Sequence, residues 1–202
     1  MLAPVARLLR EQTAATHEHI TSSLGLLDPQ LSRSRLRIVL ARFAGYWQSA
    51  ERLVDGWALE RPDEAAALQW PRRRRVEILH QDLLRLGMSV RAVTELPEAP
   101  APFADAVPTD AEVYGWLYLS EVATGGDVAP EHEEDDGPFV DVGLFHAHVD
   151  GLWESYLEQL RTWAGDSGER REAVLAAAVA GFDALEEWVT PVTLYAPAGR
   201  RP

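Results

Sequence analysis

Apolar residues recur along this chain at spacings of three and four, which is the period of an α-helix. No segment keeps the alternation of a β-strand for more than a few residues. The sequence therefore predicts an all-α fold. Its clearest stripe belongs to the second predicted helix, which we expect to follow a cap at Ser32 or Ser34 and to bury Leu36, Val39, Leu40, Phe43, Trp47, Ala50, Val54 and Trp57.

Prolines, glycines and capping residues predict where the other helices begin and end. We expect the first helix to run from near Pro4 to Gly25, the third from about Arg72 to Gly87, the fifth from Pro138 to Gly165, and the sixth from an Asp166 or Ser167 cap to Pro191. The first of these helices carries an apolar face that includes Val5, Leu9, Ile20 and Leu24. The sixth buries Val174, Ala178, Phe182 and Leu185.

The middle of the chain holds a linker and an unusual fourth helix. Residues 95–108 contain Pro97, Pro100, Pro102 and Pro108, which predicts a Pro-rich linker inside a single domain spanning residues 1–202. Thr109 and Glu112 form a capping box, and residues 113–119 are apolar or aromatic on every face, as in a fully surrounded helix. That helix runs into Gly125 and Gly126. The pair either ends the helix or lets the backbone approach another group closely.

The composition narrows the possible functions. A net charge of −13 makes nucleic acid and anionic membranes poor partners. The absence of Cys and Lys excludes thiolate ligands, disulfides, Schiff bases and a P-loop lysine. The longest apolar run, residues 173–182, is about half of the ~18–20 residues that a membrane span needs. The N-terminal residues do not show the charged and then apolar pattern of a secretion leader. We therefore expect a cytoplasmic protein, with an acidic loop at residues 131–137.

Histidines and arginines supply the candidate chemistry. His17 lies on the apolar stripe of the first helix among small residues, with Arg10 two turns earlier on the same face. This pair could hold a haem iron and a propionate, although spacing alone favours a core histidine with a satisfied hydrogen bond. Glu77 and His80 match half of a di-iron motif, and a surface role is favoured for them. The run of four arginines at residues 72–75 favours a solvated helix start over a docking patch.

Two segments together resemble the haem oxygenases. Residues 9–18, LREQTAATHE, resemble the first-helix motif of that family, in which a basic residue precedes the proximal histidine by seven positions. Residues 117–126, LYLSEVATGG, are similar to the distal-helix motif of the bacterial haem oxygenases that accompany bacteriophytochromes. The order and length of the last two predicted helices also look like that family, so the likeness spans most of the chain.

The resemblance implies a haem oxygenase-like helical bundle that binds haem as cofactor and substrate and opens it, with O2, to biliverdin, CO and iron. His17 would ligate the iron, Arg10 would pair with a propionate, Gly125 and Gly126 would form the distal wall, and Tyr118 would make a polar contact at the haem edge. Electrons would come from an external ferredoxin-like donor, since no flavin or nicotinamide fingerprint is present. A bacteriophytochrome would receive the biliverdin as its chromophore.

The chain departs from the family pattern at Val122, where the distal motif usually has a glycine, and the segment is one residue shorter before the glycine pair. This departure suits an alternative, a haem-binding or carrier protein of the same fold without efficient turnover. A thiaminase-like or di-iron relative is a further alternative. The absence of Cys argues against the thiaminase type, and the single Glu-x-x-His pair argues against the di-iron type.

Overall fold

The computed structural model describes residues 4–26, 28, 30–103, 107–123 and 151–190, and every regular element within them is helical. The all-α prediction is thereby confirmed for this part of the chain. In chain order the elements are α1 (Pro4–Leu24), α2 (Arg33–Glu60), α3 (Pro62–Ala67), the 3₁₀ helix η1 (Trp70–Arg73), α4 (Val76–Arg85), α5 (Val90–Thr94), α6 (Asp110–Ala123), α8 (Leu152–Ala164) and α9 (Gly168–Val189).

The long helices begin and end where the sequence predicts. α1 ends before Gly25, which adopts a positive φ of 71°. The Ser32 hydroxyl caps α2 by accepting a hydrogen bond from the Arg35 amide, and Ser167 caps α9 through the Arg170 amide in the same way. All eight apolar residues predicted for the second helix are buried. The helical period of the sequence therefore identified the face of α2 that forms the core.

α6 is the surrounded helix that the sequence predicts. Its capping box is formed: the Thr109 amide donates to Glu112 Oε2 at 2.7 Å, and the Glu112 amide donates to Thr109 Oγ1 at 3.3 Å. Every residue from Val113 to Val122 is buried. Gly115 lets α6 approach α9 closely, because a Cβ at that position would lie 2.6 Å from the Ala178 backbone nitrogen. A side chain there would force the two helices apart.

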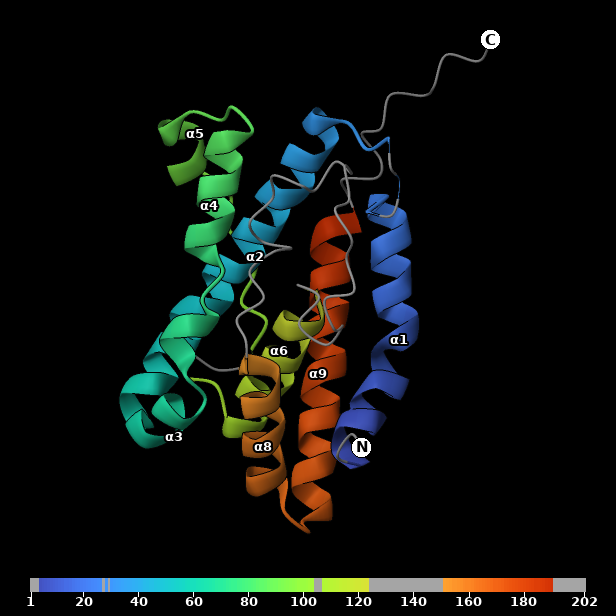
Figure 1. The fold of residues 1–202 in the computed structure, drawn as a ribbon, viewed down its shortest axis with the longest axis vertical. Coiled ribbons are helices and arrows are strands. Elements are labelled where there is room, and N and C mark those ends of the chain that lie inside the picture. Colours follow the sequence, from blue (N-terminus) through green and yellow to red (C-terminus); the bar gives the residue numbers. More distant parts are fainter. Residues whose placement is uncertain (1–3, 27, 29, 104–106, 124–150, 191–202) are drawn as a thin grey trace.

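The bundle has α6 and α9 near its middle, with α1 beside α9 on one side and the long α2 on the other (Figure 1). α4 packs on the outer face of α2. The described helices share one hydrophobic core, in which Trp47, Trp57 and Trp116 are among the largest fully buried side chains. Within the described residues, none of the helices combines the length and the apolar character needed to cross a lipid bilayer.

The third predicted helix begins later than expected. We predict a start near Arg72, but residues 70–73 form η1 and the α-helix begins at Val76. The end is as predicted, because Gly87 follows the helix with a positive φ of 91°. Gln69 has a positive φ of 54° and is followed by Trp70 and Pro71, so the chain makes a separate turn there. The short helices α3 and α5 are absent from the prediction, because elements this short carry no full helical period.

The fifth predicted helix does not pass through Gly151. Its described part, α8, begins at Leu152, because Gly151 has a left-handed φ of 79°, outside the helical region. Leu152, Tyr156 and Leu160 are buried as predicted, while residues 138–150 lie outside the described residues. The predicted linker at 95–108 contains no helix where it is described. It packs against α2, where the Ala99 amide donates to the Gly45 carbonyl at 3.1 Å.

Candidate functional site

His17 lies half-buried on the face of α1 that meets α9. Its imidazole ring is 6.0 Å from the ring of Phe182, edge to face at 65°. Thr13, one turn earlier, and Ile20, one turn later, are buried. α1 therefore places this imidazole on the inner side of the helix, against an aromatic ring, and leaves part of it exposed.

Arg10 and His19 occupy other positions on α1. Arg10 is exposed, seven residues or about 10 Å along the helix axis from His17. His19 is also largely exposed, and its Nε2 lies 3.2 Å from Glu186 Oε1 on α9. α1 thus carries a half-buried imidazole facing α9, a largely exposed imidazole paired with a carboxylate, and an exposed guanidinium.

Tyr118 on α6 lies next to Phe182, the same aromatic ring that His17 contacts. The rings of Tyr118 and Phe182 are 6.4 Å apart, and Tyr118 also lies 6.3 Å from Trp153 on α8. With 2% of its surface exposed, Tyr118 belongs to the core behind Phe182. The structure therefore links the predicted residues His17 and Tyr118 through one shared phenylalanine.

Several predicted candidates lie outside the described residues. These are the glycine pair Gly125 and Gly126 and the acidic loop at 131–137; three histidines that were not predicted to have a role, His132, His146 and His148, also lie outside. The described part of α6 ends at Ala123, directly before the segment that contains the glycine pair. Val122, the departure from the family motif, is 7% exposed and packs within the core.

The Glu-x-x-His pair is split between surface and interior. Glu77 is exposed and accepts a hydrogen bond from Gln81 Nε2 at 3.1 Å. His80 is half-buried, and its buried Nε2 has no hydrogen-bond partner among the described residues. The predicted surface role therefore holds for Glu77 and in part for His80. The described residues contain no group of three or more His, Asp or Glu side chains arranged to hold a metal ion.

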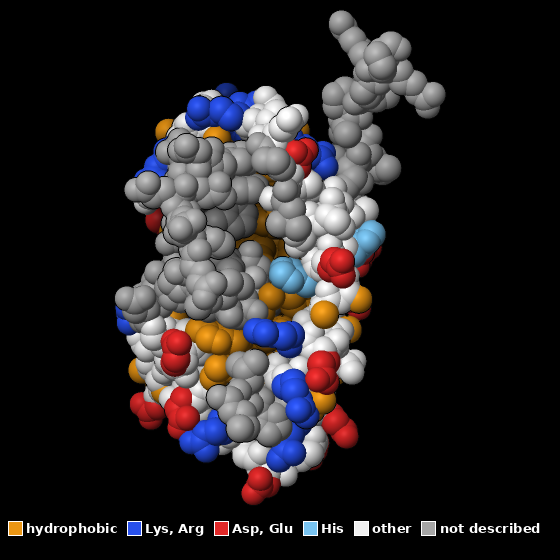
Figure 2. Space-filling model, turned by 45° about the vertical axis from the view of Figure 1, so that its right-hand side comes forward, with side chains coloured by type: hydrophobic (Ala, Val, Ile, Leu, Met, Phe, Trp, Pro, Cys, Tyr) orange, Lys and Arg blue, Asp and Glu red, His pale blue; other side chains and the backbone are white. Residues whose placement is uncertain are grey.

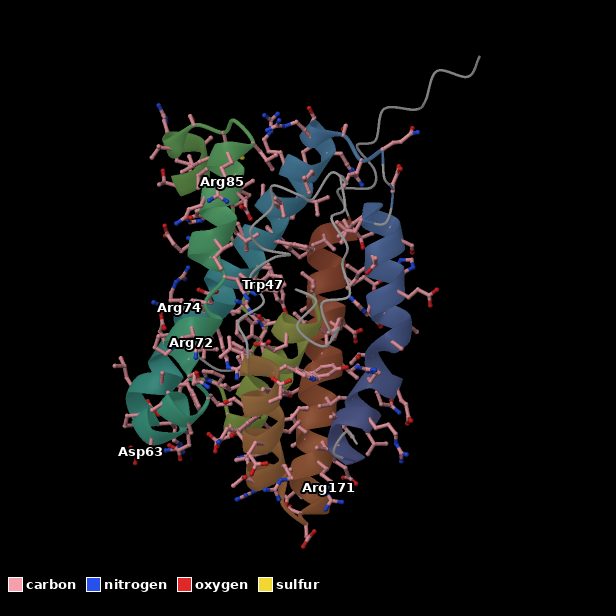
Figure 3. All side chains as sticks on the ribbon, in the orientation of Figure 1. Trp47, Asp63, Arg72, Arg74, Arg85 and Arg171 are labelled. Carbon is pink, nitrogen blue, oxygen red and sulfur yellow. The ribbon has the colours of Figure 1, made fainter. Side chains whose placement is uncertain are left out.

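The arginine run contradicts the prediction of a solvated helix start. Arg73 is fully buried and Arg75 is 2% exposed, while Arg72 and Arg74 are exposed. Figure 3 shows Arg72 and Arg74 at the outer edge of the bundle and Trp47 between the helices. The alternation arises because the 3₁₀ helix puts Trp70 and Arg73, three residues apart, on one buried face, and Arg74 is extended at φ −67° and ψ 132°, so Arg75 points inward again.

The two inward arginines meet Glu121 of α6. Arg73 Nη1 donates to Glu121 Oε1 at 2.6 Å, and Arg75 Nη2 lies 3.9 Å from the same oxygen. Burial lowers the pKa of Arg75, and the Glu121 carboxylate opposes this shift. Sequence analysis missed this cluster. Glu121 supplied a signal for it, because an acidic residue within an otherwise apolar, surrounded helix needs a cationic partner.

Glu51 forms a second buried acidic contact at the start of α4. Its Oε1 accepts hydrogen bonds from the backbone amides of Arg75 at 2.5 Å and Val76 at 3.1 Å. A side chain of α2 thereby caps α4, whose own N-cap residue Arg75 makes no side-chain cap bond. Burial raises the pKa of Glu51 to about 7, and the two backbone donors only partly offset this shift.

We predict that Glu51 makes stability fall as pH rises. Because its folded-state pKa is raised, its stabilising contribution is complete below the unfolded pKa of about 4.5 and is lost as pH rises through about 7. The loss should reach about 3 kcal/mol. Glu51→Gln keeps an oxygen acceptor but cannot ionise. Between pH 5 and 8 the wild type should therefore lose unfolding free energy relative to this variant. Urea denaturation across this range checks the prediction, and a pH-independent difference would refute it.

The molecular surface beside α1 is partly apolar. In the view of Figure 2, hydrophobic side chains form the bottom of a recess on the face where α1 comes forward, and histidine and arginine side chains lie at its border. Apolar surface beside an imidazole and a guanidinium is suited to a ligand with an apolar body and anionic groups.

No protein-family model, curated protein or solved structure matches this chain.

Proposed function

We propose that this protein is a haem oxygenase that cleaves haem to biliverdin, CO and iron. The observation that carries the proposal is the placement of His17, half-buried on the inner face of α1 and next to Phe182. A histidine in this setting has the chemistry of a proximal haem ligand. The resemblance of residues 9–18 and 117–126 to the two haem-contacting motifs of that family supports the same function.

The residues present fit a haem group. His17 offers an imidazole nitrogen for the iron, and Phe182 offers an apolar ring beside it. The exposed guanidinium of Arg10 on the same helix is suited to a propionate, whose charge needs a cation near solvent. Tyr118, buried against Phe182, would orient that ring, a role that its burial favours over the polar contact expected from the resemblance.

When bound, haem supplies an iron that activates O2 and is itself the porphyrin that is opened. The chain's own residues would bind and orient it: His17 would ligate the iron, and the apolar core, to which the buried Phe182 and Val122 belong, would exclude water. Gly125 and Gly126, which follow α6 in the sequence, are the proposed distal wall, where main chain without side chains can lie near the porphyrin. An external ferredoxin-like donor supplies electrons, and a bacteriophytochrome is the proposed recipient of the product.

Reduction of the hemin complex in air tests this function. We expect ascorbate or a ferredoxin system with its reductase to remove the Soret band and to produce biliverdin absorption, with CO released in equal amount. Catalase is added so that free peroxide does not bleach the haem. A Soret band that persists under these conditions would instead support the carrier alternative, which binds haem without opening it.

A further inference from the structure

Arg73 is a fully buried cation that binds three separate parts of the chain. Its Nε donates to the Leu68 carbonyl at 2.5 Å, its Nη1 to Glu121 Oε1 at 2.6 Å, and its Nη2 to the Leu152 carbonyl at 2.7 Å. Leu68 follows α3, Glu121 lies near the end of α6, and Leu152 begins α8. All three nitrogens of one guanidinium are therefore used to join segments far apart in the sequence.

Two of these contacts flank the segment that carries the predicted distal glycines. Glu121 lies two residues before the end of α6 at Ala123, and Leu152 is the first residue of α8. Residues 124–150 connect these two points, and Gly125 follows Glu121 by four positions. A single planar side chain thus joins the end of α6 to the start of α8.

We propose that Arg73 is a positioning residue: through Glu121 and the Leu152 carbonyl it fixes the end of α6 against the start of α8, and with them the rings of Tyr118 and Trp153, of which Tyr118 lies against Phe182. We call this arrangement the Arg73 clamp. Its consequence for haem rests on the proposed function, whereas the clamp itself is a property of the haem-free protein.

The chemistry of arginine explains why this residue suits the position. The guanidinium presents its N–H donors in a fixed plane, so the directions to the Leu68 carbonyl, Glu121 and the Leu152 carbonyl are coupled. A lysine ammonium keeps the charge but cannot hold the same three directions. The neighbouring Arg74 offers a matched comparison, because it is exposed and pairs with Asp55 at the surface.

Amide hydrogen exchange of the haem-free protein tests the clamp directly. In Arg73→Lys and Arg73→Met, we expect amides of residues 119–123 and 152–157 to exchange about 10- to 100-fold faster, with Lys the milder change. Amides of α1 and of the middle of α2 should keep wild-type protection, and Arg74→Met should match the wild type throughout. If Arg73→Met does not fold, the double variant Arg73→Met with Glu121→Met removes the directly bonded Arg73–Glu121 pair, leaves Arg75 in place, and is measured instead.

Equal acceleration across all helices would mean that Arg73 has only a general structural role, and it would overturn the proposal. Unchanged exchange at both segments would overturn it as well. A second measurement, electron paramagnetic resonance of the ferric hemin complex, should show an altered iron signal in Arg73→Lys with hemin affinity within about threefold of wild type. If the wild type binds no hemin, the proposed function fails, and the exchange result still decides the clamp.

Discussion

His17→Ala is expected to lower the affinity for hemin by on the order of 100-fold, which corresponds to about 2.7 kcal/mol of binding free energy. The substitution removes the imidazole that α1 holds beside Phe182 and leaves the surrounding apolar residues in place. Residual binding would come from apolar contact and from Arg10. Hemin titration followed by Soret absorption measures the change, with circular dichroism to verify that the helices remain.

His19→Ala is the matched control for this substitution. His19 lies on the same helix but is largely exposed and pairs with Glu186, so its removal should leave hemin affinity unchanged. Free imidazole added to His17→Gly should restore the wild-type spectrum, because a small ligand can occupy the vacated position. Equal effects of the two histidine substitutions would argue against a ligand role for His17.

Glu121→Ala is expected to destabilise the fold by about 3–5 kcal/mol. The substitution leaves the fully buried Arg73 and the nearly buried Arg75 without their shared carboxylate. Since the desolvation of an unpaired charge dominates this cost, replacing Arg73 and Glu121 together by methionine should recover part of the lost stability, while Arg75 stays buried without this carboxylate. Urea denaturation of the three proteins gives the comparison.

Glu98→Ala removes an ion pair at the surface and is the control for the buried ion pair of Glu121. Glu98 pairs with Arg52 at a position where both side chains are substantially exposed, so its removal should cost no more than about 1 kcal/mol. A cost for Glu121→Ala as small as that for Glu98→Ala would show that the buried pair contributes little. It would also remove the energetic basis of the Arg73 clamp.

Periodicity and capping chemistry were sufficient to predict the long helices. The stripe of α2 and the apolar run of residues 113–119 in α6 follow from local spacing, and the Thr109–Glu112 capping box and the Ser32 cap are local motifs whose hydrogen bonds form within one turn. These features depend on residues close in sequence. For this reason the structure reproduces them with boundaries only a few residues from those predicted.

The buried charges could not be predicted in this way. Arg73 points inward because η1 replaces a helical turn, and its partners are 48 and 79 residues away in the sequence. The contact of His17 with Phe182 likewise depends on how α1 packs against α9, which no local pattern specifies. The sequence could indicate that His17 faces inward and that Glu121 needs a cation, but the identity of each partner required the fold.

The most direct test of a His17 iron ligand is electron–nuclear double resonance of the ferric hemin complex, prepared with ¹⁵N-labelled histidine. We predict a ¹⁵N hyperfine coupling from one directly bound imidazole nitrogen, present in the wild type and in His19→Ala and absent in His17→Ala. A coupling that persists in His17→Ala, or the absence of any histidine coupling in the wild type, would contradict the account.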